Sequence, residues 1–141
     1  MIAAIRIKGI VGIDRDVKEN LTRLRLRKKN VCVVLREKPE IIKELKNLEN
    51  FIAYGKMKKE VFLELIEKRG KLIDKNKKTD KIKMAEEFLS GRIEKKLQDL
   101  NIKPFFRLHP PRGGINSKKH FPKGVLGNNK EQINDLIMRM L

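Results

Sequence analysis

Three residue types that often build binding sites are scarce or absent: the 141 residues include one cysteine, one tyrosine and no tryptophan. A lone cysteine, Cys32, excludes an internal disulfide and a paired-cysteine zinc site, and it suits a reducing compartment. The shortage of Tyr and Trp argues against the aromatic stacking sheet of RNA-recognition and cold-shock domains. Apolar residues still make up 40% of the chain, which is enough to build a core.

Acidic side chains are also scarce, with 18 Asp and Glu against 35 Lys and Arg and a net charge of +17. Such an excess attracts a polyanion, so nucleic acid is the expected partner and an anionic membrane surface a distant second. A long apolar run is missing too, because Arg6 and Lys8 interrupt the N-terminal stretch MIAAIRIKGIVGI. We recognise no signal peptide and expect a soluble cytoplasmic protein without a membrane partner.

Catalytic and metal-binding patterns are missing as well. The sequence has no P-loop and no nucleophile paired with a recognisable base. His109, His120 and Cys32 would make a poor metal set, because Cys32 lies in the middle of an expected strand. The neighbouring carboxylates Asp14 and Asp16 are explained by helix capping and solvation. We therefore expect no enzyme, no metal site, no cofactor and no small-molecule substrate.

Hydrophobic periodicity divides residues 1–56 into three strands and two helices. Residues 1–8 alternate, so that one face is apolar throughout and the other turns basic at Arg6 and Lys8. Helices are expected from Asp14 to about Leu24 and from Pro39 to Leu48, with further strands at 31–35 and 51–56. This order predicts an α+β core, a small sheet with two helices on one face.

The remaining residues form two more regions. Residues 57–100 are expected to be a helical elaboration, with a charged connector at 74–81 and a last short piece marked by Ile93, Leu97 and Leu100. Residues 101–141 are expected to hold a basic segment and then a docked terminal helix. Its buried stripe would be Ile133, Leu136, Ile137, Met140 and Leu141, and Asn129 with Gln132 resembles a capping box before it.

Residues 100–130 contain no Asp or Glu, but seven Lys and Arg and both histidines. A solvated basic loop is one explanation. The prolines and glycines of FRLHPPRGG, Phe106–Gly114, instead favour an extended backbone that follows a phosphate groove, with side chains that stack on unpaired bases. The candidate RNA-binding residues are Arg107, His109, Arg112, Gly113, Gly114, Lys118, Lys119, His120 and Lys123. Such a chain has little of its own to bury, so we expect it to be mobile without RNA.

A second basic cluster follows the first helix and consists of Arg23, Arg25, Arg27, Lys28 and Lys29. A helix dipole favours cations near its C-terminus, but two would satisfy that effect and five exceed it. We therefore expect this cluster to contact RNA. Arg6 and Lys8, expected on the open face of the first strand, are weaker candidates. The nearby GIVG, residues 9–12, follows a strand instead of lying between two helices, so it does not match the glycine clamp of KH domains.

Several longer stretches share a family likeness: FRLHPPRGG, KKHFPKGVLGNN and INDLIMRML near the C-terminus, and IRIKGIVG, LTRLRLRKKNVCVV and LENFIAYGK in residues 1–56. Together they resemble the large-subunit ribosomal protein L-thirty family in its archaeal form, similar to eukaryotic ribosomal protein L-seven. The resemblance implies a three-stranded antiparallel sheet with two helices, ferredoxin-like, plus an extra C-terminal region. It also implies a structural constituent of the large ribosomal subunit that binds rRNA and supports subunit assembly and translation.

The expected partners are therefore large-subunit (23S-type) rRNA and neighbouring ribosomal proteins, and no homo-oligomer is expected. A free RNA-binding regulator or RNA chaperone is the alternative. Such a chaperone usually carries its charge in disordered tails, whereas here well-formed core elements flank each basic stretch. A metal-dependent nuclease, the third class, would require chelator-sensitive RNA cleavage, which we do not expect.

Overall fold

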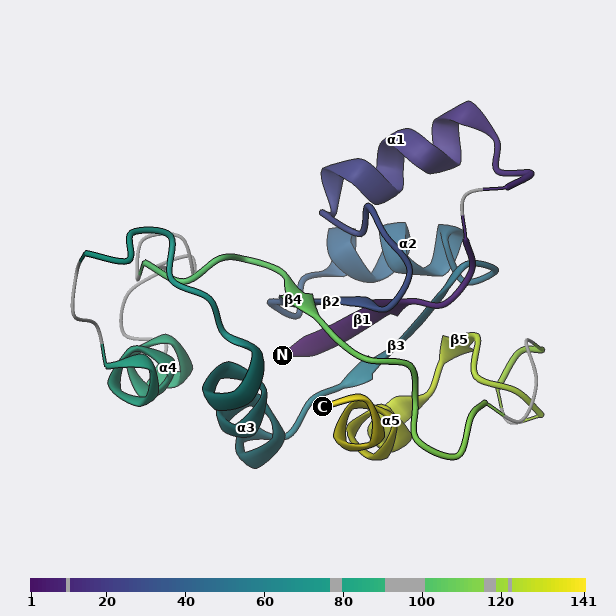
Figure 1. Cartoon of the computed structure of the whole chain (residues 1–141). Coiled ribbons are helices and arrows are strands. Elements are labelled where there is room, and N and C mark those ends of the chain that lie inside the picture. The colour runs from purple at the N-terminus through teal and green to yellow at the C-terminus, as the bar shows by residue number, and fades with distance from the viewer. Residues whose placement is uncertain (10, 77–79, 91–100, 116–118, 122) are drawn as a thin grey trace.

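The computed structural model describes residues 1–9, 11–76, 80–90, 101–115, 119–121 and 123–141. Its five strands form a mixed sheet in the order β4-β2-β1-β3-β5. In chain order the elements are β1 (Ile2–Arg6), α1 (Arg15–Arg23), β2 (Val31–Leu35), α2 (Pro39–Asn47), β3 (Ile52–Lys56), α3 (Lys59–Arg69), α4 (Lys81–Ser90), β4 (Phe106–Arg107), β5 (Gly127–Asn128), the 3-10 turn η1 (Lys130–Gln132) and α5 (Ile133–Met140) (Figure 1).

The α+β expectation is confirmed, with two more strands than the sequence predicted. β1 pairs antiparallel with both β2 and β3, which is the expected three-stranded sheet. The two additional strands are short and come from the C-terminal region. β4 joins the outer edge of β2 in antiparallel orientation, and β5 joins the outer edge of β3 in parallel orientation.

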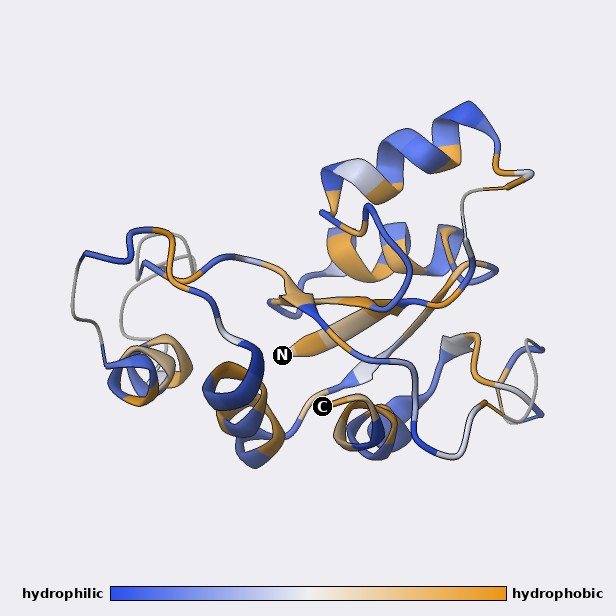
Figure 2. Cartoon of the chain, viewed as in Figure 1, coloured by the Kyte–Doolittle hydropathy of each residue, from blue (hydrophilic) through white to orange (hydrophobic). Residues whose placement is uncertain are grey.

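Both faces of the sheet are apolar and both are covered. Ile2 and Ala4 of β1 face a cluster closed by Leu21 of α1 and Leu45 of α2. The other face of β1, with Ala3, Ile5 and Ile7, packs against α3 and α5. The predicted alternation of β1 is therefore confirmed, and Figure 1 shows α1 and α2 on one side of the sheet and α3 and α5 on the other. Their hydrophobic sides turn inward (Figure 2).

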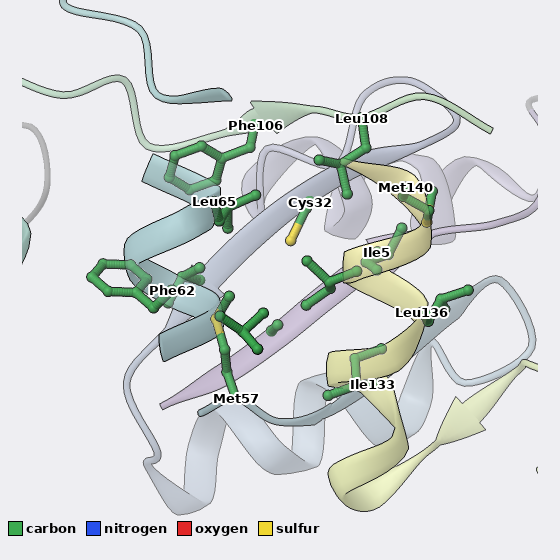
Figure 3. Packing of buried hydrophobic residues seen from close by; sticks show 14 of the residues in the cluster. Ile5, Cys32, Met57, Phe62, Leu65, Phe106, Leu108, Ile133, Leu136 and Met140 are labelled. Atoms are coloured by element: carbon green, nitrogen blue, oxygen red, sulfur yellow. The ribbon is translucent and has the colours of Figure 1, made fainter. Parts of the chain in front are cut away.

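The second cluster draws on all parts of the chain (Figure 3). Ile5 and Cys32 come from the central strands, Phe62 and Leu65 from α3, and Met140 from α5. The C-terminal basic segment contributes Phe106, Leu108, Val125 and Leu126, each less than a tenth exposed. The expectation that this segment has little to bury is therefore wrong for its described part. Its mobility without RNA stays a prediction.

The terminal helix is confirmed, but its expected cap is not. Ile133, Leu136, Ile137 and Met140 are buried. The side-chain amide of Asn129 is buried and donates to the carbonyl oxygens of Val125 (2.6 Å) and Gly127 (3.1 Å). Asn129 therefore fixes the chain that leads into the helix instead of forming a capping box, and η1 occupies the residues between them.

The described part of the middle region contains the expected helices. α3 buries Val61, Phe62, Leu65 and Ile66, and the ring centroids of Phe62 and of Phe88 in α4 lie 5.4 Å apart. The chain between these helices begins with a bridge between Leu72 and Ile102, so the segment after α3 lies beside the start of the basic segment. The short piece expected near Ile93, Leu97 and Leu100 lies outside the described residues, as does part of the connector.

Gly55 of β3 is a point of close contact between the sheet and the C-terminal region. A Cβ at this position would overlap the backbone carbonyl oxygen of Lys130 and crowd the side chain of Ile133. We expect Gly55→Ala to lower the free energy of unfolding by about 1–3 kcal/mol, because a backbone oxygen cannot move aside as a side chain does. Chemical denaturation measures this change.

Gly9 supplies the matched control for Gly55, since a Cβ there meets nothing within 4 Å. We expect Gly9→Ala to leave the unfolding midpoint close to that of the wild type. Equal midpoints for the two variants would contradict the packing of η1 and α5 against β3.

Candidate nucleic-acid interface

The pairing of β4 with β2 brings together two basic stretches that are far apart in the sequence. Arg107 lies opposite Val31 in the ladder, and the N–H of Leu108 donates to the carbonyl oxygen of Asn30 (3.0 Å). Because Asn30 ends the loop that follows α1, Arg107 lies beside the cluster that follows this helix. The sequence predicted both stretches as RNA-binding residues but not that they meet.

A groove of about 680 Å³ opens where these segments meet, and we call it the β4 groove. Its described lining contains six cations and no acidic residue. The cations are Arg23, Arg25, Arg27, Lys28, Lys103 and Arg107, and the other lining residues are Thr22, Val31, Ile73, Pro104 and Phe105. A concave surface with one sign of charge concentrates the electrostatic field and attracts anions. The groove can therefore hold a polyanion.

The expected exposure of Arg6 is wrong. The residue was expected on an open face of β1, but it is 2% exposed. Its Nη1 donates to the carbonyl oxygens of Leu26 (2.9 Å) and Arg27 (2.8 Å), and its Nε donates to that of Lys8 (3.0 Å). A buried charge is tolerated when hydrogen bonds replace its hydration. Arg6 therefore holds the loop after α1 in place from inside.

The pKa of the Arg6 guanidinium is lowered by burial, yet arginine remains charged in folded proteins. Its Nη2 also donates to the carbonyl oxygen of Gly9, at 3.3 Å. The group thus connects the loop after β1 to the loop after α1. One side chain sets the position of two loops, and Arg27 of the groove lies in one of them.

Arg25, two residues after the end of α1, has a left-handed backbone conformation, and glycine is usual at this position. The N–H of Leu26 donates to the carbonyl oxygen of Leu21 (2.8 Å), and the N–H of Arg25 donates to that of Thr22 (3.0 Å). These two bonds form a Schellman motif, and Arg25 has a φ of 65°. A side chain in this conformation costs stability that glycine would not. The guanidinium that lines the groove is thus held there at an energetic disadvantage.

Arg23 already has partners within the protein. Its Nη2 donates to Glu44 Oε1 of α2 (2.7 Å) and to Asn20 Oδ1 (3.1 Å). Both members of the Arg23–Glu44 ion pair are partly exposed, so the pair is worth little to stability. An approaching phosphate would have to compete with Glu44 for this guanidinium. Lys28 and Lys29, in contrast, are exposed cations of the loop itself.

The extended stretch Phe106–Gly114 crosses the C-terminal end of α5. The N–H groups of His109 and Arg112 donate to the carbonyl oxygens of Met140 and Arg139, each at 3.0 Å. Pro110 and Pro111, which have no N–H, lie between these two donors. The stretch therefore satisfies carbonyl groups that a helix end leaves without partners. This explains its extended form, while the side chains of His109 and Arg112 remain exposed.

The stretch Phe106–Gly114 ends in two glycines because the backbone turns there. Gly113 and Gly114 have φ values of 79° and 72°, which side-chain-bearing residues rarely adopt. The N–H of Gly114 donates to the carbonyl oxygen of Pro111 (3.0 Å), and Arg139 Nη1 donates to the carbonyl oxygen of Gly114 (3.1 Å). Both glycines therefore have a structural reason, in addition to the RNA contact predicted for them.

The remaining predicted residues gather at the opposite edge of the sheet, away from the β4 groove. Lys119, His120 and Lys123 are exposed in the chain that precedes β5, and Lys118 lies outside the described residues. His120 bridges to Leu126, and its Nε2 is 2.8 Å from Asn50 Oδ1. Lys8, half-buried two residues after β1, places its Nζ 5.8 Å from the ring centroid of Phe51. The predicted set thus divides between the β4 edge of the sheet, the C-terminal end of α5 and the β5 edge.

Other chemistries find no support among the described residues. Burial raises the pKa of the Cys32 thiol to about 12, so the thiol is protonated and a poor nucleophile or ligand near neutral pH. No group of three His, Cys, Asp or Glu in this part of the chain could hold a metal ion. No helix in the same residues is long and apolar enough to cross a membrane.

Two groove residues, Lys103 and Phe105, escaped the sequence analysis. Phe105 and Phe106 are adjacent, so an extended chain must direct them to opposite faces. The structure buries Phe106 in the core with α3 and α5 and packs Phe105 against the cluster under α1 and α2. The sequence shows that the two rings must alternate, but it does not show that the ring of Phe105 lines a groove.

Fold and surface together define a small basic α+β protein with a ferredoxin-like core. The family model for ribosomal protein L30p/L7e matches residues 2–52. Large ribosomal subunit protein uL30 of Archaeoglobus fulgidus is 40% identical, with 99% of each chain covered. The proteins of the same name from Methanococcus vannielii and Aeropyrum pernix are 36% and 35% identical, each covering 99% of this chain and 98% of their own. The chain therefore belongs to the ribosomal protein L30p/L7e family.

Arg6 provides a test of how the basic loop is held. We expect Arg6→Met to lower the free energy of unfolding by at least about 2 kcal/mol, because the buried carbonyl group of Leu26 and three part-buried carbonyl groups lose their donor. Thermal and chemical unfolding measure the loss. Arg27→Met, which removes an exposed cation from the same loop, serves as control and should change stability little. An Arg6→Met protein as stable as the wild type would contradict the bracing role.

The left-handed conformation of Arg25 leads to a prediction of opposite sign. We expect Arg25→Gly to raise the free energy of unfolding by about 1 kcal/mol, because glycine adopts positive φ without strain. Arg25→Ala keeps the strained conformation and should show no such gain. Equal stabilities of the glycine and alanine variants in thermal unfolding would count against this explanation.

Proposed function

We propose that this protein is a structural constituent of the large ribosomal subunit, where it binds large-subunit rRNA and supports subunit assembly and translation. The observation that carries the proposal is full-length similarity to proteins named large ribosomal subunit protein uL30. The β4 groove and the net charge of +17 add a physical reason for binding a phosphate backbone. The proposed location is the cytoplasm, within the subunit.

In this role the protein acts by binding and not by catalysis. The exposed groups proposed to contact rRNA are Arg23, Arg25, Arg27, Lys28, Lys29, Arg107, His109, Arg112, Lys119, His120 and Lys123. To these we add two half-buried lysines, Lys8 and the groove residue Lys103. Arg6 is left out because it is buried. Gly113 and Gly114 are exposed in a turn, where a backbone can come close to phosphate.

The two basic edges lie at opposite ends of the sheet order, one beside β4 and the other beside β5. A single rigid body that holds both can bridge two separate stretches of RNA backbone. Phosphate contacts at two places fix position and orientation better than one contact does. This arrangement suits a component that stabilises folded rRNA, and no cofactor, metal or small-molecule substrate is needed for it.

Sedimentation of a native cell extract through sucrose gradients tests the proposal. We expect one copy per large subunit at low salt and retention of that copy at high salt. Release to the top of the gradient at high salt, or association well below one copy per particle, would contradict it. That outcome would favour a free RNA-binding regulator or chaperone, because simple phosphate contacts weaken steeply as salt rises.

The groove cations can be tested directly with a matched pair of triple variants. We expect R27Q/K28Q/R107Q to weaken binding to large-subunit rRNA and to lower the slope of log affinity against log salt by about 2 to 3, roughly one for each phosphate that is no longer neutralised. Filter binding at several salt concentrations measures both quantities. K18Q/K46Q/K68Q removes three exposed helical cations outside the groove and should keep the wild-type slope. Equal slopes for the two triple variants would refute a role for the groove.

A further inference from the structure

The β4 groove has a feature that phosphate binding alone does not need, which is its apolar lining. Phe105, Pro104, Val31 and Ile73 line it together with the cations. Ile73 is 51% exposed, although large aliphatic side chains are usually buried. A site for phosphate alone would be served by cations and backbone N–H groups. The apolar lining indicates that something flat or apolar also enters.

Phe105 is the residue best suited to meet such a group. It is half-buried, packed against the cluster under α1 and α2, and it lines the groove. The guanidinium carbon of Arg107 lies 6.0 Å from its ring centroid. Alternation of the extended chain places both side chains on the same face, while Phe106 and Leu108 enter the core on the other. An anchored ring beside a guanidinium is a stacking surface.

We propose that the β4 groove receives an unpaired RNA base, stacked on Phe105, with the flanking phosphates held by the surrounding cations. The inference rests on the proposed rRNA binding and names the class of RNA element recognised. A volume of about 680 Å³ is within the range of sites that enclose a small organic group. Unpaired bases are the elements of RNA that proteins stack on aromatic rings and guanidinium planes.

The charge of the groove is complementary to this occupant. Six cations and no acid line the described part, so a nucleotide meets attraction on each side as its base enters. Arg25 reaches the groove from a left-handed backbone position, at a cost in stability that glycine would remove. The cost is explained if that guanidinium contacts the ligand. A paired base, enclosed in its stack, could offer phosphates to the rim but could not enter.

Salt dependence separates stacking from phosphate contact. We expect Phe105→Leu, which keeps an apolar side chain but loses the ring, to weaken binding to large-subunit rRNA at least about 5-fold with an unchanged salt slope. Phe105→Tyr keeps the ring and should bind nearly as the wild type does. Phe88→Leu, which removes a Phe ring of α4 outside the groove and outside the set proposed to contact rRNA, is the control and should also bind normally. Thermal unfolding verifies that all three variants are folded.

A fluorescent base provides a direct readout. The probe is a short oligouridine that carries one 2-aminopurine, compared with the same strand in a duplex. We expect the wild type to quench the single strand and not the duplex, and Phe105→Leu to lose the quenching. Unchanged quenching and rRNA affinity in folded Phe105→Leu would overturn the base site while leaving rRNA binding intact. A wild type that does not prefer large-subunit rRNA over an unrelated RNA of equal length would instead overturn the proposed function.

Discussion

The central strand β1 has two apolar faces, and the rest of the structure depends on covering both. α1 and α2 cover one face and belong to the first 56 residues. The other face, with Ala3, Ile5 and Ile7, is covered by α3, α5 and the segment around Phe106. The family model spans residues 2–52, and so it includes the strands β1 and β2 with the helices α1 and α2 that cover one face of the sheet. The described parts of the middle and C-terminal regions therefore form the second half of the core.

The same packing creates the candidate interface. Phe106 and Leu108 enter the core because the second face of the sheet needs cover, and this fixes the intervening Arg107 on the outside, beside Val31. On the other side of the groove, the guanidinium of Arg6 fixes the loop after α1 from within. The packing that forms the core thus also sets the positions of the surface cations. A change that disturbs the pairing of β4 with β2 should disturb both.

The sequence was most informative where structure is local. The alternation of β1 and the stripe of α5 follow from period alone, and both were predicted correctly. Arg6 was misplaced because charge suggests exposure, and nothing in the sequence shows that four carbonyl groups converge on it. The groove was missed for a similar reason. It depends on Val31 meeting Arg107, a contact between strands far apart in the chain, and periodicity carries no information about such partners.

The proposed RNA binding and the stability of the free protein are opposed at the β4 groove. Six cations gathered without an acid in its described lining repel one another, and Arg25 adds backbone strain. A protein that had to be stable alone would gain from glycine at Arg25 and from fewer charges. A ligand that binds the folded state and not the unfolded one adds its own stabilisation through mass action. The groove therefore has the composition expected if the proposed complex with a polyanion is more stable than the free protein, because the polyanion would supply the negative charge that the described lining lacks.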